Sequence, residues 1–208
     1  MALVFLTMLC SFKLTPNIQF TEELFSQITQ RYNQAASERV REWQSIIEAN
    51  QSSDVQDQLF EINRFFNRLE FKDDIDHWNQ PDYWATPIEF LATQAGDCED
   101  YTIAKYFSLL ELGIPNEKLR LIYVTALRPR QAHMVLGYYE TPNSIPLILD
   151  NINKRILPAN LRRDLIPIYS FNGDGLWLAK SQGRGRQVQS GGNNSLWVDL
   201  NERMKNGF

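Results

Sequence analysis

A cysteine at the start of a predicted helix is the residue of this sequence best suited to nucleophilic chemistry. The sequence Gly-Asp-Cys-Glu-Asp-Tyr at 96–101 runs directly into an apolar periodic stretch that ends at Leu112. A glycine followed by an acidic N-cap predicts that Cys98 lies in the first helical turn, where unpaired backbone N–H groups and the helix dipole favour an anion. Because the thiolate is the reactive form of cysteine, this position favours a nucleophilic Cys98.

A nucleophilic cysteine needs a base, which is usually an imidazole oriented by an acid or an amide. Of the two histidines, His77 lies in an acidic segment without regular structure, whereas His133 begins a predicted strand and Asp150 ends the next one. If these strands are neighbours, Asp150 can accept a hydrogen bond from one ring nitrogen while the other faces Cys98. The same residues also fit a structural interpretation, with a buried thiol, a satisfied histidine and a turn-forming aspartate.

Three carboxylates adjoin the cysteine, and they can be explained in two ways. Asp97 as N-cap with Glu99 and Asp100 in the first turn is a favourable helix start by itself. Yet carboxylates beside a sulfur raise the pKa of the thiol, and a bound cation would neutralise them. Carboxylate oxygens favour a hard ion, Ca²⁺ rather than zinc, with six to eight oxygens in its shell. Spacing alone leaves both explanations open.

The elements that would position these residues follow from hydrophobic periodicity. Helix formers and near-helical spacing predict helices over 21–50 and 55–69, and the helix that begins at Cys98 ends before Gly113. Between them, 72–87 is rich in acids, aromatics and prolines, which predicts a long surface loop that either lines a cleft or caps the core.

The pattern changes to that of strands after the Cys98 helix. Alternation predicts an antiparallel meander of three strands over 119–127, 132–139 and 146–150, and a fourth strand over 175–180. The segment at 181–195 is rich in Gly, Gln and Asn and is predicted to be mobile. A closing helix is predicted over 196–204. The resulting fold class is α+β, with N-terminal helices and the nucleophile helix packed on an antiparallel sheet.

Composition indicates one domain and excludes one class of partner. The 208 residues, 43% of them hydrophobic, suffice for one sizeable core, and the net charge of −4 argues against nucleic acid as the main partner. Residues 1–15 are interpreted as the remnant of an export signal, because the apolar run at 2–9 is too short to span a bilayer; the alternative is a buried N-terminal strand. A disulfide between Cys10 and Cys98 and a lipid anchor are not expected.

Five stretches carry a resemblance to a known family. The sequences at 84–91, 96–101, 132–136, 149–151 and 174–179 resemble the bacterial transglutaminase-like cysteine proteinases, over about 78–205. The resemblance implies a papain-like, transglutaminase-like core with Cys98 as nucleophile, His133 as general base and Asp150 as orienting acid. It also implies calcium dependence, with Asp97 and Glu99 as ligands and Asp100 as a less certain one.

Within that family the resemblance extends to periplasmic members that release a large surface adhesin. It implies a periplasmic location, cleavage of the adhesin's N-terminal region at a small-residue Ala-Ala site, and control by the periplasmic domain of an inner-membrane cyclic-di-GMP receptor. The expected organisation is a single proteinase domain over 16–208, with a helical part at 16–70 and a catalytic core at 78–205. Two alternatives remain: a transglutaminase-like acyl transferase that passes the acyl group to an amine, and a non-catalytic calcium-binding interaction module.

Overall fold

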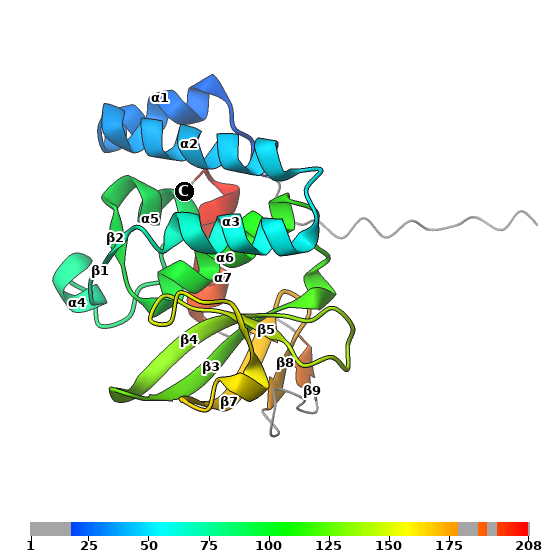
Figure 1. The fold of residues 1–208 in the computed structure, drawn as a ribbon. Coiled ribbons are helices and arrows are strands. Elements are labelled where there is room, and N and C mark those ends of the chain that lie inside the picture. The colour runs from blue at the N-terminus through cyan, green and yellow to red at the C-terminus, as the bar shows by residue number, and fades with distance from the viewer. Residues whose placement is uncertain (1–17, 179–186, 191–194, 208) are drawn as a thin grey trace, which may run out of the picture.

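The computed structural model describes residues 18–178, 187–190 and 195–207. The predicted export segment at 1–15 and most of the segment at 181–195 lie outside these residues. Helices form one layer and a curved sheet the other (Figure 1). The helices are α1 (Glu22–Arg31), α2 (Gln34–Asn50), α3 (Val55–Phe66), α4 (Asp74–His77), α5 (Pro87–Thr93), α6 (Cys98–Glu111) and α7 (Ser195–Lys205), with 3₁₀ turns η1 (Asn116–Lys118) and η2 (Ala159–Leu161). None of these described helices is long and apolar enough to cross a membrane.

The main sheet has seven antiparallel strands in the order β6-β5-β4-β3-β7-β8-β9. A separate short parallel pair joins β1 (Glu70–Phe71) to β2 (Ala95–Gly96). The strands of the sheet are β3 (Leu119–Leu127), β4 (Arg130–Tyr138), β5 (Leu147–Leu149), β6 (Leu157–Pro158), β7 (Leu165–Asn172), β8 (Gly175–Leu178) and β9 (Gln187–Ser190). The predicted α+β class and the meander of β3, β4 and β5 are confirmed.

Strand β7 was not predicted, although it lies beside β3 at the centre of the sheet. Pro167 interrupts its pattern, and the pairing register with β3 shifts between Tyr123 and Val124. Since proline cannot donate to a strand ladder, it is tolerated in sheets mainly at edges and bulges, and a bulge accommodates it here. The predicted strand at 175–180 exists as β8 and pairs with β7.

The predicted helix over 21–50 is wrong as a single element, because Asn33 divides it. The Asn33 side chain accepts a hydrogen bond from the Ala36 amide and caps α2, while α1 ends at Arg31. An N-cap of this type begins a new helix even inside a run of helix formers. The next helix, predicted to reach residue 69, ends at Phe66.

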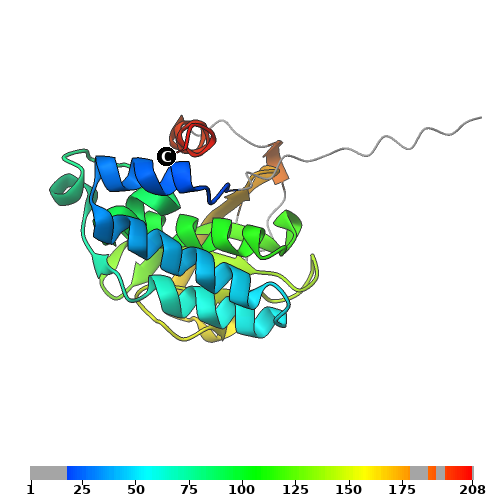
Figure 2. The ribbon, with the colours of Figure 1, turned by 90° about the horizontal axis from the view of Figure 1, so that it is seen from above.

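Helix α6 lies between the two layers, in contact with β3 and β4 on one side and with α3 and α5 on the other (Figures 1 and 2). Eleven of its fourteen residues are buried, so its position is set by packing all around it. It ends at Glu111, and Gly113 follows the C-cap Leu112 with a φ of 84°, a backbone conformation that glycine adopts without strain.

The segment at 72–87 is only partly the surface loop that was predicted. It contains the short helix α4, and the side chains of Asp74 and Trp84 are buried. Trp84 stacks on Phe171 of β7 with ring centroids 5.7 Å apart, so this part of the segment covers the core. Arg203 of α7 donates to the Trp84 carbonyl oxygen at 2.6 Å and holds the segment from outside.

Candidate active site

The first turn of α6 is fixed by a reciprocal cap. Asp97 accepts a hydrogen bond from the Glu99 amide at 3.1 Å, and Asp100 Oδ2 accepts one from the Asp97 amide at 3.2 Å. Gly96 gives Asp100 the room it needs, because a Cβ at position 96 would lie 2.2 Å from Asp100 Oδ2. The glycine and the acids at 96–100 thus build a rigid helix start that presents Cys98.

The Cys98 sulfur lies against both a carboxylate and strand β4. Its thiol donates to Glu99 Oε2 at 2.7 Å, and the Met134 backbone N–H donates to the sulfur. The Thr102 hydroxyl lies 2.8 Å from the Cys98 carbonyl oxygen and 3.0 Å from that of Met134. Burial, followed by the charges of Glu99 and Asp97, raises the pKa of the thiol well above its ordinary value, against the lowering effect of the Met134 amide.

His133 and Asp150 form a buried hydrogen-bonded pair. His133 Nε2 lies 2.8 Å from Asp150 Oδ1, and each residue is 1% exposed. Because β4 pairs with β5, the end of β5 brings Asp150 beside His133, as the sequence predicted. Nδ1 of His133 is buried and has no hydrogen-bond partner among the described residues. The other histidine, His77, contacts Thr93 Oγ1 at 2.9 Å instead.

Asp150 stays ionised in the interior because it has cationic and N–H partners. Burial alone would raise the pKa of Asp150, but hydrogen bonds from His133, Arg162 and the Ile152 amide outweigh it and hold the pKa below its usual range. Arg162 Nη2 lies 2.6 Å from Asp150 Oδ2. The sequence analysis missed Arg162, since it lies in the irregular segment after β6 and no periodicity fixes its direction.

A second group of carboxylates lies on the other side of the helix start. Oxygens of Asp74, Asp97 and Asp100 lie within 4.8 Å of one another, and Asp97 also belongs to a group with Cys98 and Glu99. Asp74 was not predicted, because it comes from α4, which the sequence analysis took for a loop. Its Oδ2 accepts from the Tyr83 amide at 2.6 Å, while Oδ1 is buried without a hydrogen-bond partner among the described residues.

Unlike Asp150, these three acids have no cationic hydrogen-bond partner among the described residues. Burial first, and then the neighbouring carboxylates, raise the pKa of Asp74 to about 6 and that of Asp97 to about 10. The pKa of Asp100 is also raised well above its usual value, chiefly by burial, although the amides of Ala85 and Asp97 donate to it. Each pKa is raised first because burial disfavours the charged form, and then because the neighbouring anions repel one another.

This group fits a hard divalent cation. Three carboxylates converge, one buried oxygen of Asp74 has no donor in the part of the chain that the structure describes, and oxygen ligands of this kind suit Ca²⁺. Asp74, Asp97 and Asp100 would supply protein ligands. Glu99, the third predicted ligand, belongs to the neighbouring group with Asp97 and Cys98, and its two oxygens accept from Cys98 Sγ and from the Tyr123 hydroxyl, each at 2.7 Å.

The fold and the site agree with a family match. Residues 23–163 match a family described as bacterial transglutaminase-like cysteine proteinase. The match spans well over half of the chain, so the protein belongs to this family, and its class is that of a cysteine protease. No protein among the curated proteins matches it.

The particular relative to which the chain is similar is LapG of Legionella pneumophila. The calcium-bound structure of that protein is 40% identical, covers 88% of this chain and 98% of its own, and has a TM-score of 0.76. The EGTA-treated structure is also 40% identical, covers 88% of this chain and 96% of its own, and has a TM-score of 0.78. The protein is therefore a cysteine protease of the LapG type with the LapG fold.

Proposed function

We propose that the protein is a calcium-dependent cysteine endopeptidase with Cys98, His133 and Asp150 as its catalytic triad. The observation that carries the proposal is the buried hydrogen bond from His133 to Asp150, next to the Met134 amide that binds the Cys98 sulfur. One ring nitrogen is held by the acid, which leaves Nδ1 for proton transfer with the thiol.

In this mechanism each step moves a proton or an electron pair between named atoms. His133 Nδ1 takes the proton of Cys98, and the thiolate attacks the scissile carbonyl carbon. The resulting oxyanion is stabilised by backbone N–H groups at the start of α6, among them that of Cys98. The imidazolium then protonates the leaving amine, and a thioester remains. Water, deprotonated by His133, hydrolyses the thioester and restores the thiol.

The carboxylates beside the sulfur explain why calcium belongs to the proposal. Asp97 and Glu99 raise the pKa of the Cys98 thiol, which opposes thiolate formation. Calcium, when bound by Asp74, Asp97 and Asp100, supplies positive charge that offsets these anions. The likeness to a LapG that is known in a calcium-bound form supports calcium as the ion.

The proposed substrate is the N-terminal region of a large cell-surface adhesin, cut in the periplasm. The proposed regulator is the periplasmic domain of an inner-membrane cyclic-di-GMP receptor, which would withhold the protease from the adhesin and so control biofilm attachment. Both proposals are supported by the motifs at 96–101, 132–136 and 149–151, which resemble those of the adhesin-releasing members of the family.

The test is cleavage of a purified N-terminal fragment of the host's largest surface adhesin. Wild type and Cys98→Ser are compared with calcium and with EGTA, and the products are followed by gel electrophoresis and mass spectrometry. Cleavage only by wild type with calcium is expected. An intact fragment that becomes crosslinked to added lysine or polyamine would instead establish an acyl transferase, and cleavage by Cys98→Ser would exclude the cysteine mechanism.

A further inference from the structure

Arg162 is a buried cation that is bound to the rear of the proposed triad. It lies just after η2, is 3% exposed, and donates through Nη2 to Asp150 Oδ2 at 2.6 Å. The same guanidinium is held from outside by Asp164, at 3.0 Å from Nε and 2.7 Å from Nη2. The 151–164 segment thus closes over Asp150 with a charged side chain.

The two carboxylate oxygens of Asp150 are held by different groups. Oδ1 accepts from His133 Nε2 at 2.8 Å and from the Ile152 amide at 3.0 Å. Among the described residues, Arg162 is the one hydrogen-bond donor to Oδ2. The backbone of Asp150 is fixed separately, because Asn67 Nδ2 donates to its carbonyl oxygen at 2.9 Å. Arg162 therefore acts on the side chain of Asp150: it orients the carboxylate and balances its charge.

We propose that Arg162 is a positioning residue of the active site, which holds the Asp150 carboxylate in the orientation that binds His133 Nε2. The proposal rests on the proposed cysteine-protease function and adds a fourth member behind the triad. A guanidinium suits this role because it donates in a fixed plane and remains charged when buried. Without it, Asp150 would keep the hydrogen bonds from His133 Nε2 and the Ile152 amide, both to Oδ1, and its carboxylate could turn away from the ring.

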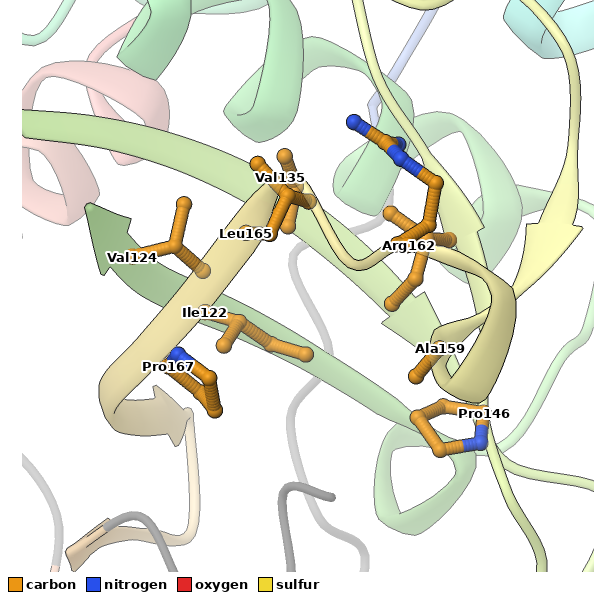
Figure 3. A pocket seen from close by; sticks show the side chains of 9 residues that line it. Ile122, Val124, Val135, Pro146, Ala159, Arg162, Leu165 and Pro167 are labelled. Carbon is orange, nitrogen blue, oxygen red and sulfur yellow. The ribbon is translucent and has the colours of Figure 1, made fainter. Parts of the chain in front are cut away.

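Arg162 also borders a pocket. It forms one wall of a partly open hollow of about 120 Å³, whose other walls include Ile122, Val135, Pro146 and Ala159 (Figure 3). The guanidinium head points away from Pro146 and Ala159. Because the hollow is partly open, a small cation added from solution has a route to the space that a shortened side chain would leave.

The test compares Arg162→Met, Arg162→Lys and Arg162→Ala with Asp164→Asn as the matched control. Asp164 binds the same guanidinium, but its side chain is half-exposed, and it contacts Arg162 rather than Asp150. We expect Arg162→Met to lower kcat about 10- to 100-fold with KM nearly unchanged, the range typical of residues that orient a reacting group. Arg162→Lys should recover part of the loss, and millimolar guanidinium, but not urea, should raise the kcat of Arg162→Ala.

A second readout needs no substrate and separates this inference from the proposed function. The proton that His133 Nε2 shares with Asp150 should give a downfield proton resonance in wild type and in Asp164→Asn, and that resonance should be lost in Arg162→Met. Wild type that shows the resonance but cuts no substrate would overturn the function and leave the role of Arg162 standing. If Arg162→Met does not fold, Arg162→Lys and the guanidinium response decide. An unchanged resonance and kcat in folded Arg162 variants would overturn the inference.

Discussion

The protein buries carboxylates at two places, and the two differ in how their charge is compensated. Asp150, behind His133, has Arg162 as a buried ion-pair partner, and its pKa is held below the usual range. The group of Asp74, Asp97 and Asp100 at the start of α6 has mainly backbone donors, and each of its pKa values is raised. The first site contains its own cation, whereas in the second site burial and mutual repulsion of the acids favour protonation or a bound cation.

This difference explains why one side of the active site favours a bound cation and the other side does not. An uncompensated buried anion is costly, so the carboxylates at the helix start either hold protons or bind a cation. Asp150 stays ionised instead, because its compensating cation, Arg162, is a residue of the same chain. Mutations at the two sites should therefore change different measurable quantities.

The largest effect is expected for Asp150→Asn. An asparagine can donate to His133 Nε2 and stabilise the wrong tautomer, so kcat on the adhesin fragment should fall about 10²- to 10⁴-fold while the circular dichroism spectrum is unchanged. The calcium concentration for half-maximal rate should stay that of wild type. Asp164→Asn is the matched control and should keep most of the activity. Undiminished turnover by Asp150→Asn would remove this residue from the triad.

The next effect is expected for Asp74→Asn, at the ligand that the sequence did not reveal. The Asp74 Oδ1 atom has no donor among the described residues and is free to bind a cation. Loss of this carboxylate should therefore weaken calcium binding about tenfold or more, measured by isothermal titration calorimetry. The exposed neighbour Asp76 provides the control, and Asp76→Asn should bind calcium like wild type. Equal calcium affinity for wild type and Asp74→Asn would exclude Asp74 as a ligand.

A smaller effect is expected where glycine gives the acids their room. Gly96→Ala puts a Cβ against Asp100 Oδ2 and should lower the free energy of unfolding by about 1 to 3 kcal/mol, measured by urea denaturation. Gly173→Ala is the control, because its Cβ would meet its first neighbour at 3.6 Å, an ordinary contact. A Gly96→Ala protein as stable as wild type would show that the cap at Asp97 and Asp100 adjusts without cost.

A further effect, which needs no mutation, is a dependence of stability on pH. Because the pKa values of Asp74, about 6, and Asp97, about 10, lie above those of an unfolded chain, the folded protein binds more protons there. Stability without calcium should therefore fall as pH rises from 5 to 8, and Tm measured with a chelator should fall with it. Saturating calcium should remove this slope. A Tm that rises over the same range with chelator present would contradict the assignment.

Sequence patterns revealed the parts of the site that lie on regular elements. Cys98 begins a helix whose capping residues are adjacent in sequence. His133 lies on β4 and Asp150 directly follows the neighbouring strand β5, so periodicity and order sufficed to propose them. Asp74 and Arg162 come from irregular segments, where no period fixes the direction of a side chain. Both became visible only through contacts in the folded chain. Asp74 contacts Tyr83 and Asp97, and Arg162 contacts Asp150.

The same reasoning explains the errors in the fold. Local composition favoured one helix over 21–50, but a single hydrogen bond from the Ala36 amide to the Asn33 side chain was enough to start a new one. Strand β7 was hidden because Pro167 breaks its alternation, and the bulge that tolerates this proline depends on pairing with β3. In each case a specific contact outweighed a statistical preference.

The most direct test of the account is the rate of adhesin cleavage as a function of calcium concentration, for wild type, Asp74→Asn and Asp150→Asn. The account predicts no cleavage by wild type without calcium. It predicts that Asp74→Asn needs more calcium to reach a near-normal maximal rate, and that Asp150→Asn reaches a much lower maximal rate at the same calcium concentration as wild type. Wild-type cleavage that persists in EGTA, or one shared response for both mutants, would contradict the separation of the two sites.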